Sequence, residues 1–261
     1  MSAHNAQTNR EYLNPPVGGH PFISVMLIVF FSFLFWLVAE LRITALSESV
    51  FPLVILTLFA FSAMWYLSGR FNVSVLAGVY GGISAALFSL VPSGLPAHII
   101  AVCAAAGWYA FMHAVAERRP RGAVLVSFVE VFVLYFAVLA WHAFSHISLF
   151  LALTMIALGT ALIFFNSVTV MCELGMWLRV RLFMFSLGVG VMIAELFAVL
   201  SKLPFHIANI DFLLFFVYYI VWDVTVRYFS IRFTKRALAV NVLLLFLGFG
   251  TVLASVRWLP V

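Results

Sequence analysis

Nine long apolar segments follow one another along the chain, and this succession limits the fold more than any other feature. A helix needs about 20 consecutive apolar residues to cross the roughly 30 Å hydrocarbon core of a bilayer. The segments cover approximately residues 22–40, 50–67, 73–91, 95–116, 123–144, 147–169, 182–201, 210–229 and 237–257. Because backbone polar groups in hydrocarbon must be satisfied within the protein, we expect every segment to be a helix.

The composition agrees with a chain embedded in a membrane. Of the 261 residues, 66% are hydrophobic and 9% are charged, and the mean hydropathy is +1.17. Soluble domains carry about 25% charged residues. The apolar segments are also too long and continuous for the alternating strands, about ten residues long, of a transmembrane β-barrel. The predicted fold is therefore an all-α polytopic membrane bundle, in which residues 22–261 form a single transmembrane domain.

The breaks between the segments decide whether the number of spans is eight or nine. Most breaks contain the Gly, Pro, Asn and charged residues that are typical of turns. These breaks lie at residues 68–72, 92–96, 117–122 and 202–209. Two boundaries are weaker, because two segments meet directly at Ser145–His146 and because residues 170–181 offer only Gly175 as a helix breaker. We expect nine spans, with eight as the alternative.

The basic residues indicate the orientation of the chain. Lys and Arg are concentrated in the cytoplasmic loops of membrane proteins. With nine spans and a cytoplasmic N-terminus, eleven of the fourteen basic residues lie on the cytoplasmic side: Arg10, Arg70, Arg118, Arg119, Arg121, Arg179, Arg181, Arg227, Arg232, Lys235 and Arg236. The other side receives Arg42, Lys202 and Arg257. This distribution predicts that the N-terminus is cytoplasmic and that the C-terminus lies outside.

The polar N-terminal segment indicates where the chain begins relative to the membrane, and the net charge of +5 raises the question of nucleic-acid binding. Residues 1–21 are expected to form a short flexible cytoplasmic tail. Cleavage of a signal peptide at Ala45-Leu46-Ser47 is the alternative, but its leader would be too long. The spread of basic residues over the loops excludes a nucleic-acid patch. We expect a multi-pass protein of the cell membrane whose partners are the lipid bilayer and either other membrane proteins or further copies of this chain.

Two segments carry a small residue at every fourth position. The third segment has Ser74, Gly78, Gly82 and Ala86, and the seventh has Ser186, Gly190, Ala194 and Ala198. Residues four apart lie on one face of a helix, so each set forms a groove of small side chains. Such grooves allow the backbones of membrane helices to approach closely. We predict two helix-packing seams, with a contact between copies or a gating surface as the alternative.

Glu130 is the charged residue with the least local compensation. It lies about 12 Å beyond the cytoplasmic start of the fifth segment, near the middle of the hydrocarbon core. No basic residue lies within one turn of it on the same segment. Ionisable residues inside spans are costly and usually face the bundle interior. Glu130 is therefore a candidate for proton or ion relay, and a structural hydrogen bond is the alternative.

Two other segments supply further relay candidates. On the seventh segment Arg181, Gly188, Glu195 and Lys202 recur every seven residues, which places them on one polar stripe. Because Ala194 and Ala198 lie close to this stripe, we expect Glu195 to face another helix. On the eighth segment Asp223 and Arg227 are four residues apart, so they share a face and can form an ion pair near the cytoplasmic end.

The histidines and cysteines provide weaker candidates for ligand binding. His142 and His146 are four residues apart at the outer end of the fifth segment, a spacing compatible with a metal ion or haem. No further ligands accompany them, so we predict no metal site and no cofactor, with haem or metal at this pair as the alternative. Cys103 and Cys172 have no metal-binding spacing and are expected to be free thiols.

These features favour three classes of function. The sequence contains no phosphate-binding Gly-rich Lys loop, no HExxH and no GxSxG motif. A transporter, channel or proton-coupled permease that uses buried carboxylates is favoured by Glu130, Glu195 and the packing seams. An accessory or scaffold subunit of a larger membrane complex is the first alternative. A membrane redox subunit with haem, or a membrane enzyme, is the second alternative, and an enzyme is the less expected outcome.

Overall fold

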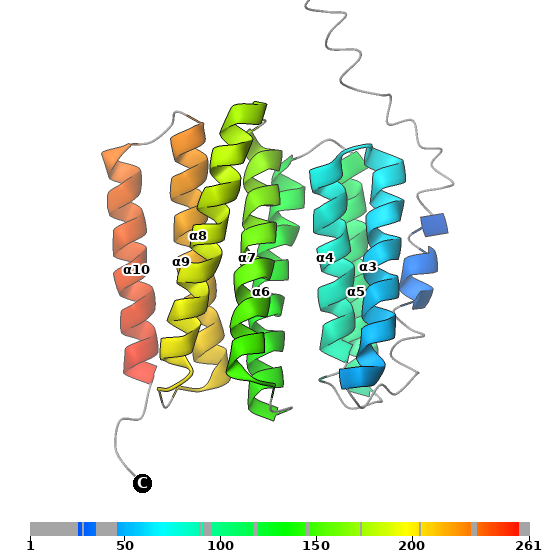
Figure 1. Ribbon diagram of the computed structural model, residues 1–261, viewed down its shortest axis with the longest axis horizontal. Coiled ribbons are helices and arrows are strands. Elements are labelled where there is room, and N and C mark those ends of the chain that lie inside the picture. The colour runs from blue at the N-terminus through cyan, green and yellow to red at the C-terminus, as the bar shows by residue number, and fades with distance from the viewer. Residues whose placement is uncertain are drawn as a thin grey trace, which may run out of the picture. The chain divides into compact units, whose positions relative to one another are not determined.

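A computed structural model describes most of the chain (Figure 1). The described residues are 26–27, 29–34, 46–88, 90, 95–116, 120–144, 147–172, 174–203, 205–230 and 234–255. The predicted tail 1–21 and most of the first apolar segment lie outside them. The described chain is helical throughout, apart from turns and short connections, and divides into two compact units near Ala123. Each unit is described by itself.

Eight helices with defined ends correspond one to one to the second to ninth predicted segments. They are α3 (Leu46–Ser68), α4 (Phe71–Phe88), α5 (Leu95–Ala116), α6 (Pro120–Phe144), α7 (Leu149–Cys172), α8 (Met176–Leu200), α9 (Ile207–Phe229) and α10 (Lys235–Ser255). Within the described residues, six helices, α4 to α9, are long and apolar enough to cross a membrane. The apolar parts of α3 and α10 within the described chain, Leu53–Ser68 and Ala239–Gly250, are shorter. The chain is therefore an all-α, multi-pass membrane protein.

Both weak boundaries of the sequence separate distinct helices. The helix α6 ends at Phe144 and α7 begins at Leu149, while α7 ends at Cys172 and α8 begins at Met176. Gly175 precedes α8 in an extended conformation. The helix α8 thus begins at Met176 rather than near residue 182, because the basic residues of its first turns continue the helix instead of ending it; Arg is a good helix former.

Unit 1 contains α3, α4 and α5, and α4 packs against α3 through its glycines. A Cβ atom added at Gly81 would lie 2.5 Å from the carbonyl oxygen of Leu56, and one added at Gly82 would lie 2.6 Å from the hydroxyl of Thr57. Gly78 also faces Thr57. The two helices therefore approach along the seam predicted from Ser74, Gly78, Gly82 and Ala86. Gly81, which that spacing leaves out, marks the closest backbone approach.

Aromatic rings fill the interior of unit 1 around Trp108 of α5. Trp108 is fully buried and stacks on Phe31 with a ring-centroid distance of 4.0 Å and an interplanar angle of 13°. Tyr80 of α4 lies beside the same indole, and its hydroxyl donates a hydrogen bond of 2.6 Å to the carbonyl oxygen of Ala104. Aromatic pairs of this kind add to the packing energy of the apolar surface.

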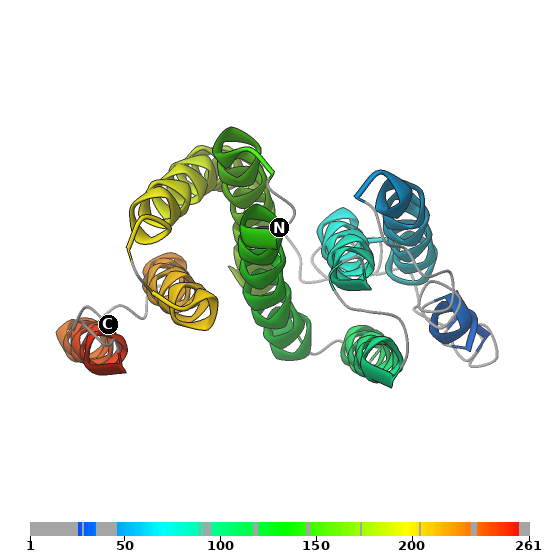
Figure 2. The same ribbon diagram turned by 90° about the horizontal axis from the view of Figure 1, so that it is seen from below.

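Unit 2 contains α6 from Val124 onward and α7 to α10 (Figures 1 and 2). The helices α7 and α8 form its closest pair, and Ser186, Gly190 and Ala194 of the predicted seam are buried. A Cβ atom at Gly190 would collide with the carbonyl oxygen of Ala157 on α7. The helix α9 packs against α6 through aromatic rings, such as Phe128 against Trp222 at 4.8 Å, and α10 packs against α9.

Candidate functional site

Buried polar residues are concentrated in unit 2. Its described residues with buried polar or charged side chains are Ser127, Glu130, Thr160, Asn166, Ser167, Thr169, Ser186, Asp211, Thr225 and Asn241. Hydroxyl groups in a membrane helix can bond to a carbonyl of the preceding turn, as Ser186 does to Leu182. Carboxylates have no such local solution, so the two acids in this set are the residues that require an explanation.

Glu130 lies on α6, about 15 Å along the helix from Pro120 at 1.5 Å per residue. The residue is 1% exposed, and within the described chain neither carboxylate oxygen has a hydrogen-bond partner. The expectation that this acid faces the interior is therefore confirmed, while the alternative of a satisfied structural hydrogen bond is not found in the described residues. An ionisable residue buried within a membrane-spanning helix is by default a candidate for a functional group.

Asp211 on α9 is a second buried acid, and sequence analysis did not single it out. The residue is 0% exposed, and both of its carboxylate oxygens also lack hydrogen-bond partners in the part of the chain that the structure describes. The predicted span began at Ile210, which left Asp211 at the edge of the segment. The helix instead begins at Ile207, which places Asp211 in its second turn and within the packed interior.

Two buried tyrosines lie on the same two helices as the acids. The hydroxyl of Tyr135 on α6 is 2.9 Å from the hydroxyl of Thr160 on α7, and either group can be the donor. The ring of Tyr218 on α9 packs against Phe128 and Phe164, with centroid distances of 6.2 Å and 5.8 Å. The Tyr218 hydroxyl has no hydrogen-bond partner among the described residues. We call Glu130, Tyr135, Thr160, Asp211 and Tyr218 the acid–tyrosine cluster.

The members of the acid–tyrosine cluster are spread along α6 and α9. Phe128 of α6 contacts Trp222 of α9 and Phe132 contacts Phe215, so the two helices are antiparallel. Glu130 and Tyr135 are about 8 Å apart along α6, and Asp211 and Tyr218 are about 11 Å apart along α9. The cluster therefore extends along the helices rather than forming a single compact pocket.

Further buried polar groups lie on α7 and α9. The indole nitrogen of Trp222 donates a hydrogen bond of 3.0 Å to the hydroxyl of Ser167, and both side chains are buried. The side-chain oxygen of Asn166 is buried without a partner, whereas its amide nitrogen donates to the carbonyl oxygen of Leu162 at 2.7 Å. Trp222 lies about one helical turn beyond Tyr218 toward the Phe229 end of α9.

The predicted pair on α9 forms the next polar level. The Arg227 guanidinium donates to the Asp223 carboxylate at 2.6 Å, and the amide of Asn241 on α10 donates to the same oxygen at 2.7 Å. The side chain of Arg227 is 42% exposed, and that of Asp223 is 13% exposed. The pairing inferred from the four-residue spacing is confirmed, and it also ties α10 to α9.

Glu195 does not face another helix of the described chain. It is exposed on α8, as are Arg181, Gly188 and Lys202 of the same stripe. The expectation that Glu195 faces a neighbouring helix is therefore wrong. Consecutive residues of a helix differ in direction by about 100°, so the contact of Ala194 with α7 turns the next side chain away from it.

The histidine pair is described in part. His142 is half-buried at the end of α6, where its Nδ1 lies 2.9 Å from the carbonyl oxygen of Ile147. His146 lies outside the described residues. Within the described chain, no three His, Cys, Asp or Glu side chains lie together in the way that a metal site requires. Cys103 and Cys172 are free thiols.

The tyrosines of the cluster and Asp211 are the residues that sequence reasoning missed. The chain has 29 Phe and 8 Tyr, so two tyrosines within apolar segments carry no signal of their own. A signal did exist in spacing, because Asp211 and Tyr218 are seven residues apart and therefore nearly share a face of α9.

Comparison with known proteins found no family model, no curated protein and no solved structure that matches this chain.

Proposed function

We propose that the chain is a proton-coupled transporter or permease, and that protons cross unit 2 through the acid–tyrosine cluster. The observation that carries this proposal is the pair of buried acids, Glu130 and Asp211, whose four carboxylate oxygens have no hydrogen-bond partner among the described residues. A packed membrane bundle tolerates such groups at a substantial free-energy cost, and in membrane proteins they mark ion and proton pathways.

The chemistry of the cluster suits proton transfer. A carboxylic acid binds a proton when it is buried and can release it to a neighbouring acceptor, which avoids an isolated charge in a low-dielectric interior. A tyrosine hydroxyl both donates and accepts hydrogen bonds, so Tyr135 and Tyr218 can link the levels of Asp211 and Glu130. We infer that Asp211 exchanges protons with one side of the membrane and Glu130 with the opposite side.

The orientation of the chain is part of the proposal. Nine spans in the cell membrane, with the N-terminus in the cytoplasm and the C-terminus outside, are supported by the distribution of Lys and Arg and by the eight helices from α3 to α10. The ends of α6 and α9 that lie nearest to Asp211 then face outward. A reporter fused to the C-terminus should be active outside the cell, and cytoplasmic activity would contradict nine spans.

Proton flux into liposomes tests the relay without knowledge of a co-substrate. The purified chain is reconstituted with a pH-sensitive dye inside the vesicles, and a potassium diffusion potential drives protons inward. The natural chain should acidify the lumen faster than protein-free liposomes do. Glu130→Gln and Asp211→Asn keep the size of each side chain but remove the exchangeable proton, so both should reduce the rate to that of protein-free liposomes.

Glu195→Gln is the matched control. Glu195 is an acid of the same unit, but it is exposed on α8 and lies outside the acid–tyrosine cluster. This variant should keep the rate of the natural chain. If Glu130→Gln and Asp211→Asn remain monodisperse by size-exclusion chromatography and conduct like the natural chain, the acid–tyrosine cluster is not the proton path.

A further inference from the structure

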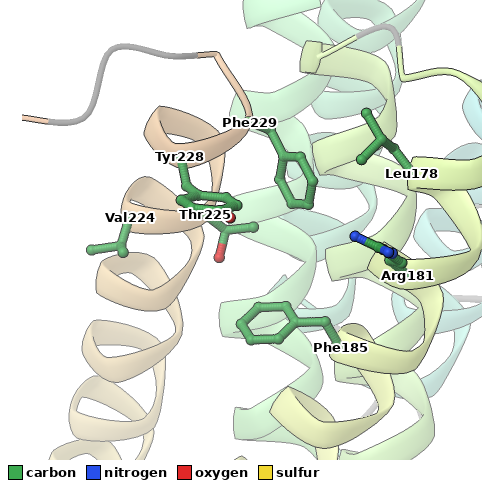
Figure 3. Close-up of a pocket in the computed structure, with 7 residues that line it drawn as sticks. All are labelled: Leu178, Arg181, Phe185, Val224, Thr225, Tyr228 and Phe229. Carbon is green, nitrogen blue, oxygen red and sulfur yellow. The ribbon is translucent and has the colours of Figure 1, made fainter.

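A pocket of about 430 Å³ lies between α8 and α9 of unit 2 (Figure 3). Leu178, Arg181 and Phe185 line it from α8, and Val224, Thr225 and Tyr228 line it from α9. Its volume lies in the range of natural ligand pockets, about 300–1,000 Å³. Phe185 is 48% exposed and Tyr228 is 69% exposed, so the pocket is accessible from outside the protein.

The walls of the pocket are mostly apolar, and the polar groups among its lining side chains belong to Arg181, Thr225 and Tyr228. The hydroxyl of Thr225 donates to the carbonyl oxygen of Val221 on its own helix at 2.7 Å, so this donor is not free for a ligand. Of the lining residues, all of which belong to the described chain, Arg181 alone carries a formal charge. Figure 3 shows its guanidinium directed toward the space between the two helices.

Arg181 is available to bind an anion. Its guanidinium lies 5.4 Å from the ring centre of Trp177, which holds the side chain in place without neutralising its charge. No carboxylate of the described residues forms an ion pair with it. Arg179, two residues earlier, is engaged differently, because its Nε donates to the carbonyl oxygen of Leu174 at 2.7 Å.

The position of the pocket along the helices matches the structure of a lipid. Arg181 lies about 8 Å from the start of α8, and Phe185 lies one turn deeper. The α9 residues that line the pocket belong to its last turns, which end at Phe229. The pocket therefore extends from the level of the headgroups into the level of the acyl chains, with its charge nearer the surface. Basic pockets between membrane helices bind anionic headgroups.

We propose that this pocket binds one anionic phospholipid from the surrounding leaflet. The phosphate group lies against the Arg181 guanidinium, and an acyl chain lies along Phe185, Leu178 and Val224. A neutral lipid would match the apolar walls but leave the guanidinium without an anion. This site goes beyond the proposed proton path, because none of its lining residues belongs to the acid–tyrosine cluster.

Lipid titration followed by native mass spectrometry tests the site. The detergent-solubilised full chain is titrated with dioleoyl phosphatidylglycerol, with dioleoyl phosphatidylcholine or with inorganic phosphate. Phosphatidylglycerol should bind at one saturable site and more tightly than phosphatidylcholine. Arg181→Gln should weaken phosphatidylglycerol binding about fivefold, which is the effect expected for one basic residue near an anionic lipid. Inorganic phosphate alone should not bind, because it has no acyl chain.

Two further variants make the result decisive. Arg179→Gln removes one positive charge from the same turn of α8 but not from the pocket, so it should keep the affinity of the natural chain. Val224→Trp fills the pocket while Arg181 remains, and it should also weaken binding. Equal weakening by Arg179→Gln and Arg181→Gln would overturn the proposal, because charge alone would then be responsible. Equal affinity for the two lipids, or binding of phosphate alone, would overturn it as well.

Discussion

Among the described residues, the buried polar positions of unit 1 are Ser68, Ser74 and Ser84, whereas those of unit 2 include two carboxylic acids, Glu130 and Asp211. The serine hydroxyls of Ser68 and Ser74 donate to carbonyl oxygens four residues earlier in the chain, which satisfies them locally. Among the described residues, the carboxylates of Glu130 and Asp211 have no hydrogen-bond partner. Unit 1 contains one buried polar side-chain atom of this kind in its described part, the indole nitrogen of Trp108, which is uncharged. The described parts of the two units therefore differ in that unit 2 encloses ionisable groups.

Helix packing follows the same principle in both units. A glycine of α4 in unit 1 and a glycine of α8 in unit 2 each face the backbone of a neighbouring helix, at Leu56 and at Ala157 respectively. Lipid offers no hydrophobic driving force for helix association, so close packing at such glycines contributes much of the stability. Within each unit the helices therefore pack in the same way, at glycines. The units differ in the buried polar side chains of their described residues.

The largest expected effect is the loss of stability when a glycine at one of these helix contacts is replaced by a large residue. Gly190→Leu would force α8 away from α7 and should lower the free energy of unfolding by roughly 3 kcal/mol, the upper range for overpacking. Gly188 lies half a turn away, and a Cβ atom there would meet nothing within 4 Å. Gly188→Leu should therefore change stability by less than about 0.5 kcal/mol. Thermal unfolding in detergent, followed by intrinsic tryptophan fluorescence, measures both variants.

Gly81→Leu extends the test to unit 1, where it should destabilise the protein to a similar degree. A loss of stability in Gly188→Leu as large as that in Gly190→Leu would show that side-chain size on α8, rather than contact with α7, sets the effect.

The helices could be predicted almost completely because a helix that crosses a bilayer needs a long run of apolar residues, and such runs are visible in the sequence. The second to ninth segments each became one helix, even where Gly175 was the only breaker. The ends were less predictable. Met176 and Ile207 begin their helices before the expected positions, since amphiphilic residues near a membrane surface are compatible with both helix and loop.

The candidate site could be predicted only where a single residue violated the local pattern. Glu130 stands out because a carboxylate in the middle of an apolar segment has few explanations. Glu195 violates the pattern equally, yet a seven-residue repeat shows only which residues share a face and not which way that face points. Tyr135 and Tyr218 acquire meaning from neighbours on other helices, such as Thr160, and sequence spacing within one helix cannot supply that information.

The smallest expected effect on stability comes from two tyrosine variants, one in each unit, which should nevertheless differ clearly in proton flux. Tyr135 of unit 2 and Tyr80 of unit 1 are both buried, and the hydroxyl of each takes part in an interhelical hydrogen bond, with Thr160 at 2.9 Å and with Ala104 at 2.6 Å. Tyr135→Phe and Tyr80→Phe should each reduce the free energy of unfolding by about 1 kcal/mol, the usual net contribution of such a bond. The two variants should therefore unfold at similar temperatures.

In the liposome assay the two variants should differ, because Tyr135 belongs to the acid–tyrosine cluster and Tyr80 does not. We expect Tyr135→Phe to lose proton flux and Tyr80→Phe to keep it. Equal flux in the two variants would remove Tyr135 from the proton path and reduce its role to the packing role of Tyr80.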